Sequence, residues 1–165
     1  MSRQSGGTPA IIELDRCHIA YKLREYEHDP AANRRFGLEV VDKLGLNADQ
    51  IFKTLIAEAD GRLVVAVVPV SGSLDLKALA SAVGAKRAAM ADPAVAEKTT
   101  GYVVGGISPI GQKRRLTTVL DQSAMGFPAV FVSAGRRGLD VELAPADLVL
   151  ATDARLAAIA RPGNW

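Results

Sequence analysis

Two apolar, β-branched runs separated by an Asp-Gly turn constrain the fold of this chain more than any other feature. The runs cover Ile51–Glu58 and Leu63–Val70, and the residues Ala59–Arg62 lie between them. Asp60-Gly61 can supply the positive φ angles of a tight turn, so the pattern predicts a β-hairpin. Because a hairpin requires antiparallel pairing, a purely parallel βαβ fold is disfavoured.

Capping and turn residues divide the rest of the chain into short helices and strands. Thr8-Pro9, Asp75 and Asp92-Pro93 have the form of helix starts, and glycine follows several expected helix ends. We expect helices over Thr8–Lys22, Phe36–Leu44, Asp75–Gly84, Asp92–Gly101 and Pro145 to about Ile159. We expect further strands at Tyr102–Val104, Thr117–Asp121, Ala129–Ser133 and Leu139–Leu143. The predicted fold is α/β (mixed α+β), with a mixed or barrel-like sheet flanked by helices.

Length and composition indicate one domain that needs no metal or disulfide. A chain of 165 residues with 48% hydrophobic residues can bury one substantial core. Cys17 is the only cysteine, which excludes an intrachain disulfide and a cysteine-built zinc site and fits a reducing cytosol. The N-terminus is polar and no stretch has the length and apolarity of a membrane helix. We therefore expect a cytoplasmic protein with a flexible tail over residues 1–7 and a folded domain over residues 8–160.

The overall charge does not by itself indicate nucleic-acid binding. Twenty Lys and Arg against 18 Asp and Glu leave a net charge of +2. Local basic groups stand beside expected turns, namely Arg34-Arg35, Lys86-Arg87, Lys113–Arg115 and Arg136-Arg137. These groups either form a solvated surface or contact phosphates.

Lys53 is the single residue that most suggests a site. It lies inside the apolar run Ile51–Ile56, and strand alternation places it on the face opposite Phe52 and Thr54. Either that face is wet and the lysine blunts an edge strand, or the lysine lines a cleft. In a cleft its ammonium could bind a phosphate or a ribose-linked carbonyl.

The Gly-rich run Gly101–Arg115 is the second candidate. Gly105, Gly106 and Gly111 allow close approach of a ligand to the main chain, and their N–H groups could stabilise an oxyanion or a phosphate. The run is not a P-loop, because Gln112 precedes Lys113 and no Ser or Thr follows. A structural turn between strands is the alternative.

Histidine-based chemistry and metal binding have little support. His28-Asp29 could resemble a catalytic dyad, but no G-x-S-x-G pattern accompanies it, and Asp29 before Pro30 is typical of a capped loop. His18 and His28 are the only histidines and have no HExxH spacing. We expect no metal and no organic cofactor.

Seven strings in order give the chain a resemblance to a known family. They are TPAI at Thr8, YEHDP at Tyr26, FGLE at Phe36, FKTL at Phe52, MADP at Met90, TGYVVGGISPIGQKRR at Thr100 and GRRGLDVELAP at Gly135. Together they resemble the YbaK-type cysteinyl-tRNA(Pro) deacylases of the prolyl-tRNA synthetase editing-domain superfamily, from about Thr8 to Ile159. The resemblance implies a mixed sheet that is closed partway into a barrel and surrounded by helices.

The resemblance also implies a reaction and a set of site residues. The enzyme would act in trans to cleave cysteine from mischarged tRNA(Pro), with the substrate thiol as nucleophile and a cyclic thioester as product. It would bind the tRNA(Pro) acceptor end and work in a transient complex with prolyl-tRNA synthetase. Lys53 and Gly105 would be catalytic, and the substrate-binding residues would be Tyr26, Phe36, Thr54, Gly106, Ser133 and Asp140.

Two other functions remain open at this point. A sibling deacylase could remove alanine or another small amino acid with an activated water, and a non-catalytic module could bind tRNA or the synthetase. The sequence also departs from the family at Ala134, where a glycine is common. If that position requires a positive φ, alanine would be strained by about 1 kcal/mol.

Overall fold

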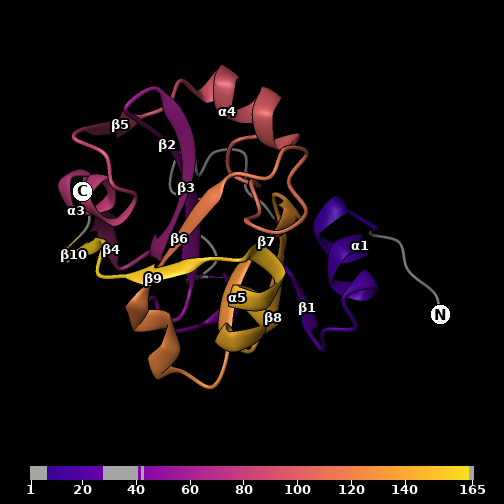
Figure 1. Cartoon of the computed structure of the whole chain (residues 1–165). Helices are drawn as coiled ribbons and strands as arrows, with labels where there is room; N and C mark the ends of the chain where they lie inside the picture. Colours follow the sequence, from indigo (N-terminus) through magenta and orange to yellow (C-terminus); the bar gives the residue numbers. More distant parts are fainter. Residues whose placement is uncertain (1–6, 28–40, 42, 164–165) are drawn as a thin grey trace.

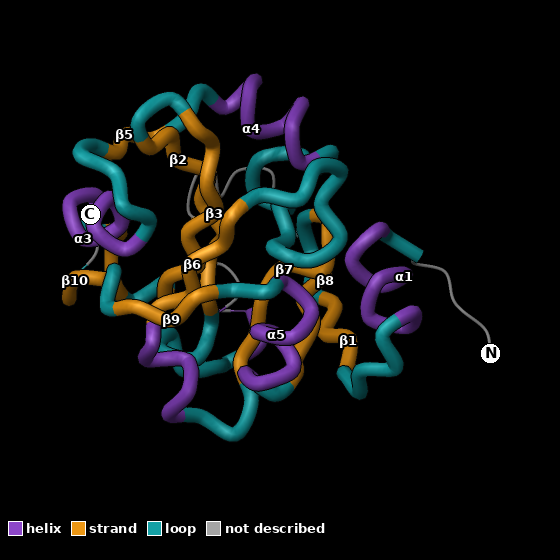
Figure 2. Tube along the Cα trace, viewed as in Figure 1, coloured by secondary structure: helices purple, strands orange, loops and turns teal. Residues whose placement is uncertain are grey.

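The computed structural model describes residues 7–27, 41 and 43–163. Its elements are α1 (Pro9–Arg16), β1 (Lys22–Glu25), β2 (Phe52–Ala59), β3 (Arg62–Pro69), β4 (Gly72–Leu74), α3 (Leu76–Ala82), β5 (Ala88–Met90), α4 (Pro93–Thr100), β6 (Thr117–Asp121), the 3-10 helix η2 (Gln122–Gly126), β7 (Val130–Arg136), β8 (Leu139–Leu143), α5 (Pro145–Thr152), β9 (Arg155–Ala157) and β10 (Ala160–Pro162). Figures 1 and 2 show β2, β3 and β6 in the middle of the molecule, with α1, α3, α4 and α5 around them.

The central sheet is mixed, as predicted. Its five strands run in the order β5-β2-β3-β6-β9. β2 pairs antiparallel with β3 and β5, whereas β3–β6 and β6–β9 are parallel. The fold therefore combines a hairpin with crossover connections.

The predicted hairpin forms with its turn at the expected position. Ala59 pairs with Arg62, and the two residues between them have positive φ angles, 50° at Asp60 and 85° at Gly61. The Asp60 carboxylate also accepts hydrogen bonds from the Lys86 and Arg87 N–H groups, at 2.8 and 3.1 Å. The turn is thus held both by its backbone preference and by the segment that leads into β5.

A second, three-stranded sheet has the order β1-β8-β7 and is antiparallel throughout. A two-stranded β10-β4 pair completes the described strands. The prediction of a sheet closed partway into a barrel is wrong for this part of the chain. The central sheet and the β7 sheet meet at one isolated parallel bridge, between Ile51 and Phe131, and no described ladder continues from it. The described strands therefore form separate open sheets and no closed barrel.

Local capping signals located most helices correctly and failed where a helix ends early. Asp75 and Asp92 cap α3 and α4 by accepting hydrogen bonds from Ala78 and Ala94 N–H groups. The first helix stops at Arg16 instead of Lys22, because His18 takes a left-handed φ of 59° and turns the chain into β1. The last helix stops at Thr152 instead of Ile159, where Asp153 adopts φ 55°.

Several short strands differ from the prediction. Tyr102–Val104 is a turn, not a strand, and Tyr102 instead packs its ring in the core. The strands β1, β4, β5, β9 and β10 were not predicted, and each has only three or four residues. The predicted helix over Phe36–Leu44 lies mostly outside the described residues.

The core is divided by the central sheet. The larger cluster lies between this sheet, the β7–β8 ladder and helices α1 and α5, to which Ala10, Leu14 and Leu148 contribute. A second cluster packs α3, through Leu79 and Val83, on the opposite face of the sheet. A small third cluster forms around the bridge, from Ile51, Val70 and Phe131.

Candidate active site

Lys53 lies on β2 between two apolar clusters. On its face of the strand it is flanked by Ile51, which belongs to the cluster at the bridge, and by Leu55, which packs against the cluster under α3. Its ammonium nitrogen is buried, and this burial lowers the pKa of Lys53 to about 8. The lysine therefore does not blunt a solvated edge. It remains largely cationic at pH 7 and can bind a carbonyl or phosphate oxygen.

The bridge between β2 and β7 brings Ser133 to the same face as Lys53. Ile51 pairs in parallel with Phe131, and the Phe131 N–H donates to the Gln50 carbonyl at 3.0 Å. Lys53 and Ser133 each lie two residues beyond this pair. Since side chains alternate along a strand, both share the face that carries Ile51 and Phe131. Two predicted site residues from distant parts of the sequence therefore converge.

Asp140 completes this face as a buried carboxylic acid. It pairs with Ser133 on β7 and with Arg24 on β1, and only 5% of its surface is exposed. The Arg24 guanidinium, however, forms its ion pair with Glu142, at 2.9 Å. No described group donates a hydrogen bond to the Asp140 carboxylate, and burial raises its pKa to about 7. Asp140 can therefore gain or lose a proton near neutral pH.

The turn after Ser133 is built without strain at Ala134. The Ser133 hydroxyl oxygen accepts a hydrogen bond from the Gly135 N–H at 3.1 Å. The positive φ, 111°, falls on Gly135, where an added Cβ would lie 2.8 Å from the Tyr102 ring. Ala134 is not among the described residues with a positive φ, and it is fully buried in the main core. The departure from the family pattern at this position therefore leaves Ser133 in place.

Tyr26 lies beside the same turn, at the end of β1. Its N–H donates to the Gly138 carbonyl at 3.0 Å, and its side chain packs against the cluster at the bridge. The structure thus brings Tyr26 near the Ser133–Asp140 pair. Phe36 and His28 lie outside the described residues.

Thr54 lies on the opposite face of β2 from Lys53, as the alternation predicted. Its hydroxyl oxygen is buried and has no hydrogen-bond partner among the described residues. β5 pairs with β2 only over Ala57–Ala59, so the preceding part of that edge has no described ladder partner. The Ile56 carbonyl accepts from Ala91 at this edge. Since backbone groups alternate in direction along a strand, the Thr54 N–H and C=O point to the same edge of β2. A substrate could form main-chain hydrogen bonds there.

The Gly-rich segment reaches the β7–β8 turn through Gly106. A Cβ at Gly106 would lie 2.8 Å from the backbone of Arg136 and Arg137, so only glycine allows this contact. Gly105 has φ 91°, and no backbone hydrogen bond from its N–H to another described residue is found. The segment is therefore a turn with a structural role that also leaves an N–H group available to a ligand.

Two residues that hold this segment were missed by the sequence analysis. Glu97 on α4 accepts a hydrogen bond from the Val104 N–H at 2.8 Å. Arg137 donates from Nε and Nη2 to the Val104 carbonyl, at 2.9 and 2.6 Å. The sequence analysis gives Arg137 only as part of the basic pair Arg136-Arg137. Nothing in the neighbouring sequence distinguishes an arginine that binds a backbone carbonyl from one that is solvated.

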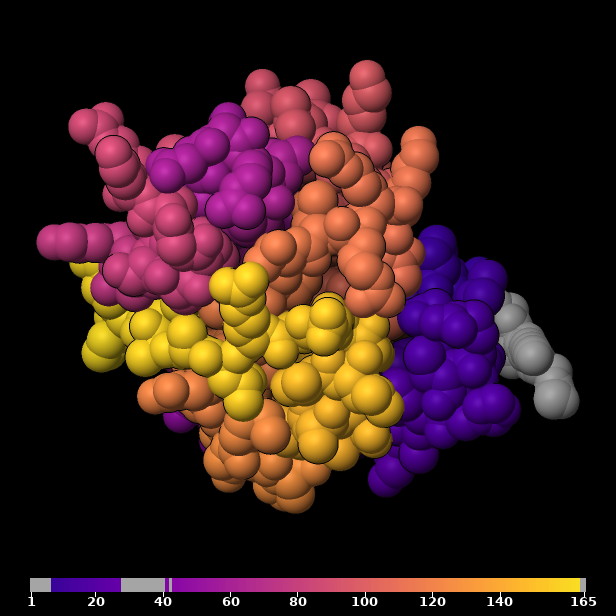
Figure 3. Space-filling view, in the orientation of Figure 1, coloured from indigo at the N-terminus to yellow at the C-terminus, as the bar shows by residue number. Residues whose placement is uncertain are grey.

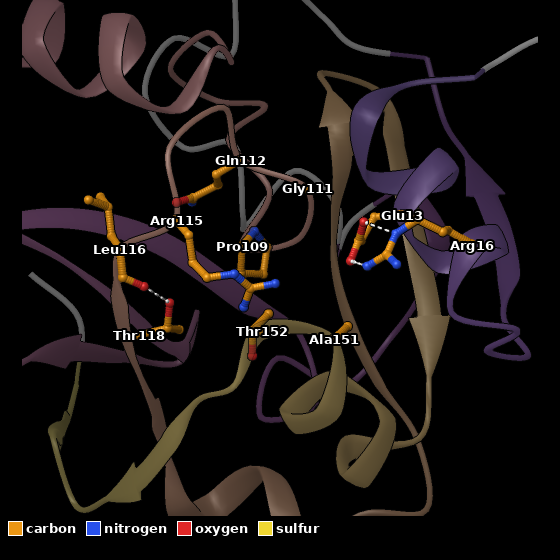
Figure 4. Close-up of a pocket in the computed structure, with 10 residues that line it drawn as sticks. All are labelled: Glu13, Arg16, Pro109, Gly111, Gln112, Arg115, Leu116, Thr118, Ala151 and Thr152. Carbon is orange, nitrogen blue, oxygen red and sulfur yellow. Dashed lines mark hydrogen bonds and ion pairs between the residues drawn. The ribbon is translucent and has the colours of Figure 1, made fainter.

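Two surface hollows that described residues form lie away from Lys53. One, of about 140 Å³, has the Glu13–Arg16 ion pair of α1 on one wall and Arg115 with Pro109 on the other (Figure 4). The other, of about 380 Å³, is lined by Arg62, Arg114 and Arg115. In Figure 3 the orange segment that carries Arg114 and Arg115 lies between the hairpin, to which Arg62 belongs, α1 and α5. Arginine side chains line both hollows, which suits the binding of an anion.

Metal and membrane features are not found in the described structure. No group of three His, Cys, Asp or Glu residues within 7–27, 41 and 43–163 could hold a metal ion. None of the helices in these ranges is both long and apolar enough to cross a membrane.

Comparisons with known proteins agree on one family. The sequence profile of the "Aminoacyl-tRNA editing domain" matches residues 38–150. The chain is 39% identical over 153 residues to the Enterococcus faecalis protein named "Putative Cys-tRNA(Pro)/Cys-tRNA(Cys) deacylase EbsC", with 92% of each chain covered. It is 32% identical to a proline–tRNA ligase of Geobacter metallireducens, in a match that covers 72% of this chain and 24% of the ligase.

A solved structure has the same fold. It is described as "a putative trans-editing enzyme for prolyl tRNA synthetase" and superposes with a TM-score of 0.81 at 24% identity, over 97% of this chain and 99% of the other. At that identity the likeness concerns the fold alone.

Proposed function

This chain belongs to the aminoacyl-tRNA editing domain family and is an aminoacyl-tRNA deacylase, and we propose that it hydrolyses mischarged Cys-tRNA(Pro) in trans. The matched profile begins at residue 38, yet α1 contributes Ala10 and Leu14 to the main core. We therefore propose that the editing domain extends over residues 8–160. A cytoplasmic location fits a tRNA substrate.

The observation that carries the proposal is the convergence of a buried lysine and a buried carboxyl group on one face where the described residues offer no activated hydroxyl or thiol nucleophile. The Ser133 hydroxyl oxygen accepts a hydrogen bond from the Gly135 N–H, and Cys17 lies at the C-terminal end of α1, where its thiol contacts Glu13. Among the described residues no histidine adjoins Ser133, because His18 lies in the loop after α1. A site of this kind suits a substrate that brings its own nucleophile.

In the proposed reaction the cysteine thiolate attacks the carbonyl carbon of its own ester. A carbon–sulfur bond forms, the carbon–oxygen bond to the ribose breaks, and the ribose oxygen takes a proton as the tRNA leaves. The cyclic thioester then opens with water to give free cysteine. The protein has to hold thiol and carbonyl in proximity and stabilise the charge on the carbonyl oxygen. We assign these tasks to Lys53 and to the Gly105 N–H.

The remaining site residues would hold the aminoacylated adenosine. We propose that Thr54 contacts it through the open edge of β2, and that Tyr26, Phe36, Gly106, Ser133 and Asp140 shape the pocket. The basic hollow lined by Arg62, Arg114 and Arg115 would contact phosphates of the tRNA(Pro) acceptor end. A transient complex with prolyl-tRNA synthetase would add to the modest attraction expected from a net charge of +2.

The test compares the deacylation rates of Cys-, Ser-, Ala- and Pro-tRNA(Pro) with the wild type, Lys53→Ala and the exposed-lysine control Lys77→Ala. We expect rapid cleavage of the cysteinyl ester alone, since serine has a much weaker nucleophile in place of the thiol. Loss of the lysine should lower the rate by about 10²-fold or more, as for removal of an oxyanion donor, while Lys77→Ala should match the wild type.

Other outcomes of this test would replace the proposal. Faster cleavage of Ala-tRNA(Pro) than of the cysteinyl ester would indicate a sibling deacylase that uses activated water. Cleavage of none of the four esters, with tRNA still bound, would indicate a non-catalytic binding module.

A further inference from the structure

Two contacts hold the backbone of Val104 beside the proposed site, one on each of the peptide groups that flank its Cα. The Val104 N–H is held by the Glu97 carboxylate on α4, and the Val104 carbonyl by the Arg137 guanidinium on the β7–β8 turn. Both N–H groups of the arginine fork donate to the same oxygen, and Arg137 itself is exposed. A solvated arginine of a merely basic turn would not need this geometry.

The carbonyl of Val104 and the N–H of Gly105 belong to the same peptide group. Because a trans peptide is planar, its C=O and N–H point in opposite directions. An arginine that holds the carbonyl on one side therefore directs the Gly105 N–H to the other. The φ of 91° at Gly105 and the close contact of Gly106 with the Arg136-Arg137 backbone fix the chain on either side of this peptide.

A cationic donor on the carbonyl also strengthens the N–H of the same peptide. Hydrogen bonds polarise one another along a chain, and a charge-assisted bond polarises its partner most. No backbone hydrogen bond from the Gly105 N–H to another described residue is found, so this added donor strength is available to a ligand.

We propose that Arg137 is a positioning residue, which orients and polarises the Gly105 N–H as a hydrogen-bond donor to the reacting ester carbonyl. The inference rests on the proposed function, because it needs Gly105 to face the ester. Glu97 holds the preceding peptide group, through the Val104 N–H.

The test uses Arg137→Ala, Arg137→Lys and a matched control, Arg155→Ala. Arg155 is also an exposed arginine whose guanidinium donates to one backbone carbonyl, that of Ala82, at 3.1 Å, but it does so at the end of α3. For Arg137→Ala we expect kcat to fall by about 10-fold to 100-fold, below the effect of deleting an oxyanion donor outright, with KM changed by less than about threefold. Arg137→Lys keeps the charge but not the fork and should recover part of kcat. Arg155→Ala should leave kcat and KM as in the wild type.

A second measurement does not depend on activity. The amide ¹⁵N resonance of Gly105 in the free protein responds to hydrogen bonding at the preceding carbonyl, so it should move in Arg137→Ala and stay in place in Arg155→Ala. An unmoved Gly105 resonance, or a loss that falls entirely on KM, would overturn the role of Arg137. If the wild type cleaves no ester while the resonance moves as expected, the proposed function fails and the peptide contact stands.

Discussion

At the scale of single residues, Asp140 is a carboxyl group that is buried without a described cation to pair with it. It is 5% exposed, it faces Ser133, and the neighbouring Arg24 is engaged with Glu142. An uncompensated buried carboxylate destabilises a fold, so its retention on this face fits a role in binding the substrate and not in stability. We propose that the ammonium group of the substrate is the cation that pairs with it.

The pKa of about 7 at Asp140 predicts a pH dependence of stability. The folded pKa lies above the unfolded value, so between about pH 4 and pH 7 the folded state binds more protons than the unfolded state. The free energy of unfolding should therefore decrease as the pH rises through this range, by up to about 4 kcal/mol. Asp140→Asn should remove most of this decrease. Urea unfolding at pH 5 and pH 8 checks this.

The exposed carboxylate of Glu58 on β2 provides the control for that measurement. Glu58→Gln should keep the pH dependence of the wild type. Equal pH dependence in Asp140→Asn and the wild type would mean that Asp140 is ionised without cost in the folded protein.

At the scale of elements, the docking of the Gly-rich segment on the β7–β8 turn joins two halves of the proposed site. Gly106 allows this contact, since a Cβ there would lie 2.8 Å from the Arg136 and Arg137 backbone. Gly106→Ala should therefore push the segment away from the turn, lower the free energy of unfolding by about 1–3 kcal/mol, and reduce deacylation. Gly126→Ala in η2, where nothing lies within 4 Å of the added Cβ, is the matched control. Chemical unfolding and ester cleavage measured on both variants decide whether the contact matters.

Elements that are specified locally could be predicted from the sequence. Asp60-Gly61 and the caps at Asp75 and Asp92 act through neighbouring backbone groups, and the hairpin, α3 and α4 form where expected. β1 and β9 could not be predicted, because strands of four and three residues carry little periodicity and are stabilised by partners far along the chain. Tyr102 has strand-like chemistry, but its hydroxyl donates to the Ile110 carbonyl at 2.7 Å inside a turn.

The site was predictable to a similar extent. The face of Lys53 followed from alternation alone, whereas its proximity to Ser133 depends on the isolated bridge at Ile51, which no local pattern encodes. The pairing of Asp140 with Ser133 follows from the β7–β8 ladder. The ladder does not predict that Arg24 forms its ion pair with Glu142 and not with Asp140. Long-range contacts of single side chains are the part that sequence patterns leave out.

At the scale of the whole molecule, charge is distributed so that a nearly neutral protein can still bind a polyanion. The net charge is only +2, yet Arg62, Arg114 and Arg115 line one hollow, near the turn of the β2–β3 hairpin. Lys53 lies near the other end of β2, six residues before Ala59, which corresponds to about 20 Å along the strand. One face could thus contact the tRNA acceptor stem while the open edge of β2 holds its terminal adenosine.

This arrangement predicts how binding of tRNA(Pro) depends on salt. The double variant Arg114→Ala/Arg115→Ala should weaken binding and reduce the slope of log K against log salt by about 1.4–1.8, because each lost phosphate contact removes about 0.7–0.9. Cleavage of a short aminoacyl-adenosine ester should be unaffected, since that substrate does not reach the hollow. Lys77→Ala/Arg155→Ala removes the same charge at α3 and β9 and should leave the slope unchanged. Equal slopes for the two double variants would show that the arginines act only through net charge, and the acceptor stem would then have to bind elsewhere.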